Sequence, residues 1–132
     1  MQMTKGILAI GFAVGLGVLS PNANAMTLYT GPHWADSGAS YHACNVVNVG
    51  LTAITDLQVV LHKFDGSVAA TSGVITLNPG QTLEVVASPS YGGFARCRFY
   101  SPTAVGSQLR GNIAVFRWAG TYYETLATEV AR

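Results

Sequence analysis

Short apolar runs alternate with turn-forming residues at regular intervals along most of the chain. This spacing is typical of a β-sandwich or barrel, because short strands in such folds are separated by Gly, Pro, Asn and Asp. The pattern predicts a loop over residues 30–40 and seven strands, which are residues 41–49, 55–64, 67–71, 74–77, 82–87, 95–101 and 108–118. The Tyr and Thr residues of 121–129 favour an eighth strand there. The alternative is a helix over residues 122–132, in which Leu126, Glu129 and Val130 share one face.

Two turns between these runs have specific backbone requirements. Asp65-Gly66 predicts a two-residue hairpin turn, in which both central residues adopt positive φ. Asn78-Pro79-Gly80 predicts a second turn, because Pro presets its own φ and Gly accepts the left-handed conformation. Both turns favour antiparallel neighbours.

The alternation in the first predicted strand, residues 41–49, is inconsistent. Val46 shares a face with Cys44, whereas Val47 lies on the opposite face. Either both faces of this strand are covered, or a β-bulge shifts its register.

The first 25 residues have the three parts of a secretory signal. Lys5 precedes an apolar run over residues 6–19, and the small residues of Ala23-Asn24-Ala25 form a cleavage site. The apolar run is shorter than the roughly 20 residues that a membrane-spanning helix needs, although an uncleaved anchor is the alternative. We therefore expect a signal peptide over residues 1–25, a single domain over residues 26–132, and a secreted or periplasmic location in a bacterium.

Charge excludes some classes of partner for the domain that remains after cleavage. Residues 26–132 contain six basic and six acidic side chains, so their net charge is near zero. A neutral domain has no long-range field that attracts nucleic acid or anionic lipid. We expect neither nucleic-acid binding nor membrane association after cleavage.

The two cysteines, Cys44 and Cys97, both lie in the expected mature domain. An even number of cysteines in an oxidising compartment predicts a disulfide. Catalytic or metal-binding cysteines are usually closely spaced, unlike this pair.

No motif in the sequence predicts a catalytic residue, a cofactor or a metal site. His33, His42 and His62 match no metal-ligand spacing, and the shared parity of His42 and Cys44 favours a buried, hydrogen-bonded histidine. The Gly-x-Ser-x-Gly elbow of many hydrolases is missing from the sequence. The expectation is that the protein is not an enzyme.

With a cysteine on an early strand and a cysteine on a late one, the chain resembles an immunoglobulin-like β-sandwich. The turn motifs Asp65-Gly66 and Asn78-Pro79-Gly80 also resemble those of small bacterial extracytoplasmic sandwich domains. The resemblance implies two antiparallel sheets of seven or eight strands, joined across the core by the disulfide. Phe99 would lie beside that bridge.

The same resemblance implies a candidate binding surface. If Cys97 points inward, alternation turns Arg and Tyr side chains outward on residues 95–101, and Arg and aromatic side chains outward on residues 108–118. In an immunoglobulin-like sheet these two strands are neighbours, so they would share one outer face. The predicted partner-binding residues are Arg96, Arg98, Tyr100, Arg110, Phe116 and Trp118.

Arg and aromatic side chains are enriched at binding hot spots, which favours a partner such as another extracellular protein or a carbohydrate. The alternative is that these side chains only stack on each other and cover the sheet. The sequence thus favours an exported, non-catalytic binding or structural accessory module. Two alternatives are an inhibitor of an extracellular hydrolase, acting through a loop over residues 88–94, and a subunit of a surface assembly that pairs through an open sheet edge.

Overall fold

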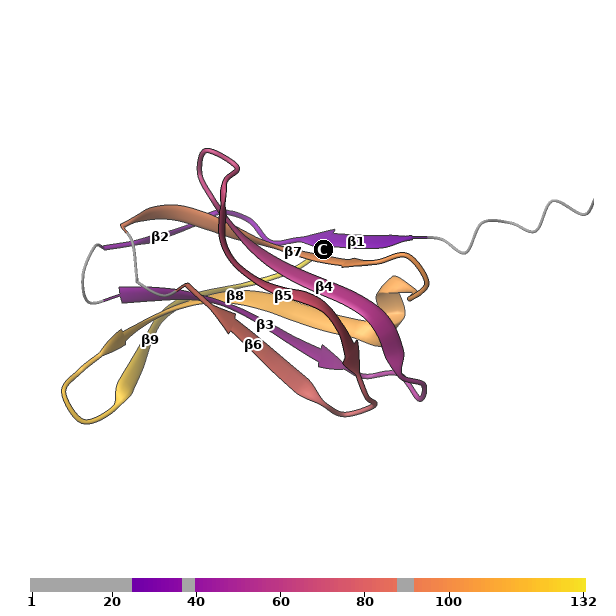
Figure 1. The fold of residues 1–132 in the computed structure, drawn as a ribbon. Helices are drawn as coiled ribbons and strands as arrows, with labels where there is room; N and C mark the ends of the chain where they lie inside the picture. Colours follow the sequence, from indigo (N-terminus) through magenta and orange to yellow (C-terminus); the bar gives the residue numbers. More distant parts are fainter. Residues whose placement is uncertain (1–24, 37–39, 88–91) are drawn as a thin grey trace, which may run out of the picture.

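The computed structural model describes residues 25–36, 40–87 and 92–132, and about two thirds of them belong to antiparallel strands (Figure 1). The elements are β1 (Met26–Tyr29), β2 (His33–Ala35), β3 (Ser40–Asn48), β4 (Ile54–Lys63), β5 (Val68–Leu77), β6 (Thr82–Val86), β7 (Gly93–Ser101), the short 3-10 helix η1 (Gly106–Gln108), β8 (Leu109–Trp118) and β9 (Tyr123–Val130). The predicted all-β class is confirmed. Residues 1–24 lie outside the described ranges, so the signal peptide stays a prediction.

The strands form two sheets packed face to face (Figure 1). Sheet A has the order β1-β7-β4-β5, and β2 also pairs with β7. Sheet B has the order β6-β3-β8-β9. The predicted two-sheet sandwich is therefore correct, and it is compatible with an immunoglobulin-like architecture.

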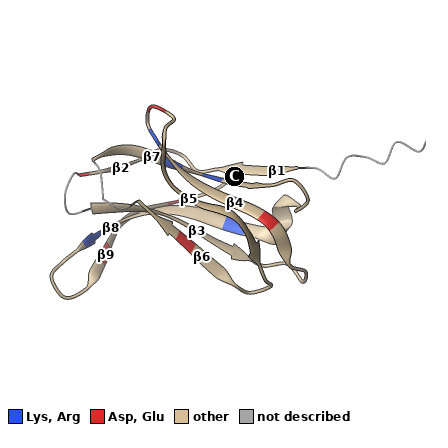
Figure 2. Cartoon of the chain, viewed as in Figure 1, with Lys and Arg blue, Asp and Glu red and all other residues tan. Residues whose placement is uncertain are grey.

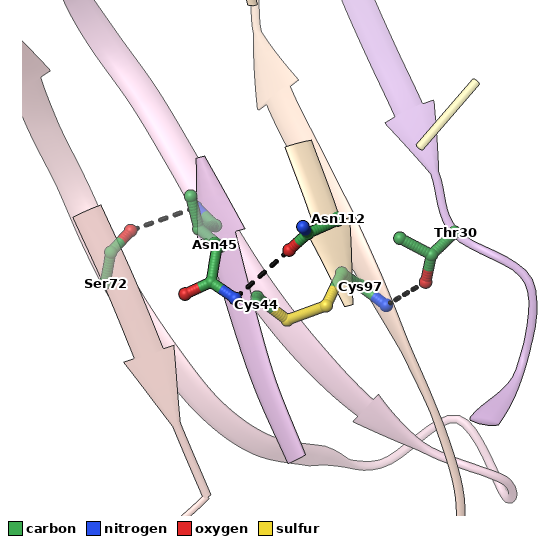
Figure 3. Close-up of a disulfide and its surroundings, with 7 residues drawn as sticks. Thr30, Cys44, Asn45, Ser72, Cys97 and Asn112 are labelled. Atoms are coloured by element: carbon green, nitrogen blue, oxygen red, sulfur yellow. Dashed lines mark hydrogen bonds between the residues drawn. A yellow bond between two sulfur atoms is a disulfide. The ribbon is translucent and has the colours of Figure 1, made fainter. Parts of the chain in front are cut away.

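The predicted disulfide crosses the core from one sheet to the other (Figure 3). Cys44 of β3 and Cys97 of β7 are both fully buried, with their Cα atoms 5.7 Å apart. Phe99 is also fully buried, and its ring occupies the space above Gly111: a Cβ atom added at Gly111 would lie 2.8 Å from the Phe99 Cζ atom. The bridge and this aromatic ring hold the two sheets in one packing arrangement.

The open question about β3 is settled by its pairing with β8. The register runs without a shift from Ser40 to Asn48, so the strand contains no bulge. Val46 faces the core and is 3% exposed, while Val47 lies on the outer face and is half-buried.

Several predicted boundaries were wrong at the ends and joints of strands. The segment predicted as a loop contains β2, and β1 precedes it. The two runs predicted as separate strands, residues 67–71 and 74–77, form the single strand β5, because Gly73 adopts a positive φ of 65° and the strand continues through it. The helical alternative for the C-terminal segment was also wrong, since β9 pairs with β8.

The two predicted turns differ in outcome. At the β5–β6 junction, the Gln81 N–H donates to the Asn78 carbonyl and Gly80 has a φ of 73°, as expected. The β4–β5 hairpin has a three-residue loop, because the Lys63 N–H donates to the Ser67 carbonyl and only Gly66 has positive φ. A type I turn followed by a left-handed glycine gives this geometry, so the predicted two-residue turn was wrong.

The predicted pairing of the strands after the second cysteine was also wrong. In immunoglobulin domains, the strand that follows the second cysteine joins the sheet of the strand that carries it. Here β7 is flanked by β4 on one side and by β1 and β2 on the other, so it has no free edge for β8. β8 instead pairs with β3 in sheet B.

Candidate functional site

The six residues of the predicted binding surface do not share one face. Arg96, Arg98 and Tyr100 lie on β7 in sheet A, whereas Arg110, Phe116 and Trp118 lie on β8 in sheet B. All six point away from the core as alternation predicts, but their strands belong to opposite layers of the sandwich. The expectation of a single surface was therefore wrong.

The sheet A residues make contacts with neighbours on their own face. The Arg98 guanidinium lies 5.8 Å from the Tyr100 ring centroid and donates to the Gln58 side-chain oxygen at 3.0 Å. The Arg96 guanidinium lies 5.5 Å from the ring centroid of Tyr29 on β1. These cation–π and hydrogen-bond contacts fit the alternative in which arginines cover an outer sheet face.

The sheet B residues belong to a cluster of four aromatic side chains, which we call the aromatic cluster: Tyr41, Phe116, Trp118 and Tyr123. The rings of Tyr41 and Phe116 stack with centroids 5.6 Å apart, and Tyr123 stands edge-on to Phe116 at 5.3 Å. Trp118 packs against Tyr123 at 4.9 Å. Trp118 and Tyr123 remain 47% and 61% exposed, so much of their apolar surface faces solvent.

A shallow groove extends from this cluster across the outer face of sheet B, and we call it the sheet B groove. Its centre has a small side chain, Ala114, which lies opposite Ala43 in the neighbouring strand. Farther along, the Asn45 amide donates to the Asn112 side-chain oxygen at 3.1 Å (Figure 3). Glu84 of β6 lies opposite Asn45 in register, which completes a polar row across three strands.

Charge around the groove is sparse and of both signs. Figure 2 shows how few Lys, Arg, Asp and Glu residues the strands contain. Glu84 and Arg110 are the charged side chains that line the groove. Arg110 donates to the Leu109 carbonyl at 2.8 Å, so its guanidinium is held close to the sheet. A groove with one group of each charge does not select a strongly charged ligand.

Sequence reasoning identified half of this site. Arg110, Phe116 and Trp118 follow from the alternation of β8, whereas Tyr41, Asn45 and Glu84 lie on strands that become neighbours only through the sheet B order. The outward parity of Tyr41 relative to Cys44 was the available signal. It could not indicate which strand lies beside it.

The Asp56 carboxylate has a structural role at the β7–β8 junction, where it contacts a serine hydroxyl. Asp56 accepts hydrogen bonds from the Ser101 hydroxyl and, at 2.6 Å, from the Thr103 hydroxyl. These two hydroxyls lower the pKa of Asp56 below its ordinary value. Ser101 is fully buried and also accepts the Ala104 N–H at 2.9 Å, so its oxygen holds the turn and is inaccessible to a substrate.

The three histidines make separate contacts. His33 lies 3.5 Å from the Glu129 carboxylate, and His62 contacts the Gly66 carbonyl. His42 is fully buried and contacts the His33 carbonyl at 3.0 Å, which confirms the predicted core histidine. Among residues 25–36, 40–87 and 92–132, no three His, Cys, Asp or Glu side chains gather closely enough to hold a metal ion.

His42 is expected to make stability depend on pH. Burial lowers the pKa of His42 below its ordinary value of 6.5. The unfolded chain therefore binds a proton near that pH while the folded protein does not, so the free energy of unfolding should fall as the pH decreases from about 7.5 to about 5. Urea titrations across this range would measure the slope. His42→Gln should flatten it and His62→Gln should not; equal slopes for the two variants would contradict the assignment.

Two of the sheet edges, β9 and β1, have features that oppose strand addition. The pairing of β9 with β8 shifts register beside Phe116, which places a bulge in the edge strand. At the edge of β1, Tyr29 and Arg132 exchange backbone hydrogen bonds of 3.1 and 3.0 Å. Bulges and covered edges limit the pairing of β9 and β1 with other chains.

Comparison of the chain with known families, curated proteins and solved structures found no match. Within the described residues, no helix is both long and apolar enough to span a membrane. The loop predicted as an inhibitory element falls largely on residues 88–91, which lie outside the described ranges; Gly93 and Phe94 begin β7.

Proposed function

We propose that this chain is an exported, non-catalytic binding module that holds its ligand in the sheet B groove. The observation that carries the proposal is the aromatic cluster beside a polar row on one face, with Trp118 47% and Tyr123 61% exposed. Large aromatic side chains beside a hollow with a few polar groups are the usual composition of a binding site.

Two features of this face support its choice. Exposed aromatic side chains occur on both sheets, since Trp34 and Phe94 of sheet A pair edge-on at 5.1 Å. On sheet B the exposed rings adjoin the polar row of Asn45 and Asn112. The apolar positions of the groove come from four adjacent strands, so the rigid sheet sets the ligand geometry. Export is supported by the predicted signal over residues 1–25, the disulfide, and the resemblance to small bacterial extracytoplasmic domains.

A retention experiment with two matched variants tests the proposal. The immobilised mature protein would be exposed to the extracellular protein and polysaccharide fractions of its source organism. Trp118→Ala should reduce the retained material by about tenfold or more, because a half-exposed aromatic anchor commonly contributes over 1.4 kcal/mol. Trp34→Ala removes a comparably exposed Trp from β2 in sheet A and should leave retention unchanged.

Two results would contradict this function. Equal retention by the two variants would show that binding does not involve the groove. Turnover of any retained material by the purified protein would show that the module is catalytic.

A further inference from the structure

We infer that the ligand of the sheet B groove is a neutral oligosaccharide; this inference rests on the function proposed above. Three features of the groove support this inference: its exposed aromatic rings, the polar row, and the distance between the aromatic cluster and the polar row. Each feature matches a chemical property of a pyranose chain.

Two rings of the aromatic cluster have solvent-facing surface that can stack on a sugar. A pyranose ring has an apolar face of C–H groups, which pack on an aromatic face with the loss of little polar hydration. Tyr123 stands at 79° to Tyr41 and at 89° to Phe116, and Trp118 is tilted by 60° from Tyr123. The Tyr41–Phe116 pair thus supports the two exposed rings, which remain available for contact with a ligand.

The polar row supplies both donors and acceptors. An amide side chain has two N–H groups and an oxygen with two lone pairs, so the single bond between Asn45 and Asn112 leaves further donors and acceptors on both. Glu84 adds acceptor oxygens in the same row. Adjacent hydroxyls of a sugar donate and accept at once, which suits this mixed set.

The polar row also argues against an apolar protein segment as the ligand. A hydrophobic side chain seated over Asn45, Asn112 and Glu84 would remove water from these groups without replacing its hydrogen bonds, which is costly. Hydroxyls replace those bonds. A carbohydrate is therefore the ligand class that both ends of the groove accept.

The distance between the polar row and the aromatic cluster sets the length of the ligand. Along β3, the polar row at Asn45 and the aromatic cluster at Tyr41 are four residues apart, or about 13 Å at the rise of a β-strand. One monosaccharide is too short to contact both, whereas a short oligosaccharide reaches from one to the other. The charges of Glu84 and Arg110 oppose each other, which favours a neutral chain.

Calorimetric titration of the disulfide-bonded mature protein with four neutral probes tests the inference: cellohexaose, maltohexaose, laminarihexaose and hexa-N-acetylchitohexaose. At least one should bind to the unmodified protein. Tyr123→Ala and Asn45→Ala should each weaken that binding by about tenfold or more. The matched controls are Tyr100→Ala and Gln58→Ala, which remove the same side-chain types from the outer face of sheet A and should leave affinity unchanged.

Three other outcomes would contradict the location of the sugar site, the carbohydrate inference, or the proposed function as well. Hexaose binding that falls equally in groove and control variants would show that the sugar site lies elsewhere. A second outcome is that no hexaose binds, but the immobilised Trp118→Ala variant still retains less extracellular protein than the unmodified chain does. The carbohydrate inference is then wrong and the proposed binding function stands. If no hexaose binds and retention is insensitive to Trp118, both are wrong. Circular dichroism and unfolding midpoints establish that each variant is folded.

Discussion

Reduction of the Cys44–Cys97 disulfide is expected to lower the free energy of unfolding by about 4 kcal/mol. The bridge joins residues 53 positions apart in sequence, so it removes a large part of the conformational freedom of the unfolded chain. It also fastens β3 of sheet B to β7 of sheet A at the centre of the core (Figure 3). A domain of this size has a total stability of only about 5–15 kcal/mol, so the bridge should supply a large share of it.

Guanidinium titrations of the same protein, oxidised and reduced, would measure this difference without removing any core atom. A thiol count before each titration establishes the redox state. The Cys44→Ala/Cys97→Ala variant is the control, because its unfolding should not respond to reductant. A difference below about 1 kcal/mol between the oxidised and reduced protein would contradict the expected contribution of the bridge.

Replacement of Asn48 by Ala is expected to destabilise the fold by about 3 kcal/mol, because it leaves several backbone groups without a partner. The Asn48 amide nitrogen donates to the Leu77 carbonyl at 2.9 Å and to the Thr52 carbonyl at 2.8 Å. Its side-chain oxygen accepts the Gly50 N–H at 2.9 Å. One fully buried side chain thus joins the β3–β4 connection to the end of β5.

Urea unfolding of Asn48→Ala beside Asn45→Ala would test this role. Asn45 lies on the same strand, but on the outer face and only partly buried, so its replacement should cost less than about 1 kcal/mol. Equal destabilisation by the two variants would show that strand propensity, and not the Asn48 hydrogen bonds, sets the effect. Asn48→Asp tests the same point, because it keeps the acceptor and removes both donated bonds.

The alternation of residues was sufficient to predict which side chains face the core on the central strands. Cys97 and Phe99 are buried and Arg96 is exposed, as the period of two requires. Parity also placed His42 in the core. These predictions hold because inside and outside are local properties of a strand once one inward residue is known.

The candidate site could be predicted only in part, since it depends on which strands lie side by side. The resemblance to immunoglobulin domains placed β8 next to β7, and the structure places it next to β3. Because of this difference in sheet order, Arg98 and Phe116 lie on opposite outer faces of the sandwich. It also brings Tyr41 of β3 into contact with Phe116, a pairing that alternation within one strand does not contain.

The sequence by itself determined the all-β class, the disulfide pair, the β5–β6 turn, and the inward or outward direction of residues on β7 and β8. These properties depend on local periodicity, on the conformational range of Gly and Pro, and on there being only two cysteines to pair. The tertiary structure alone decided the sheet order, the two early strands that occupy the edge of β7, and therefore the composition of the sheet B groove. Sheet order results from competition between non-local pairings of similar energy, and the outcome depends on the packing of the entire domain.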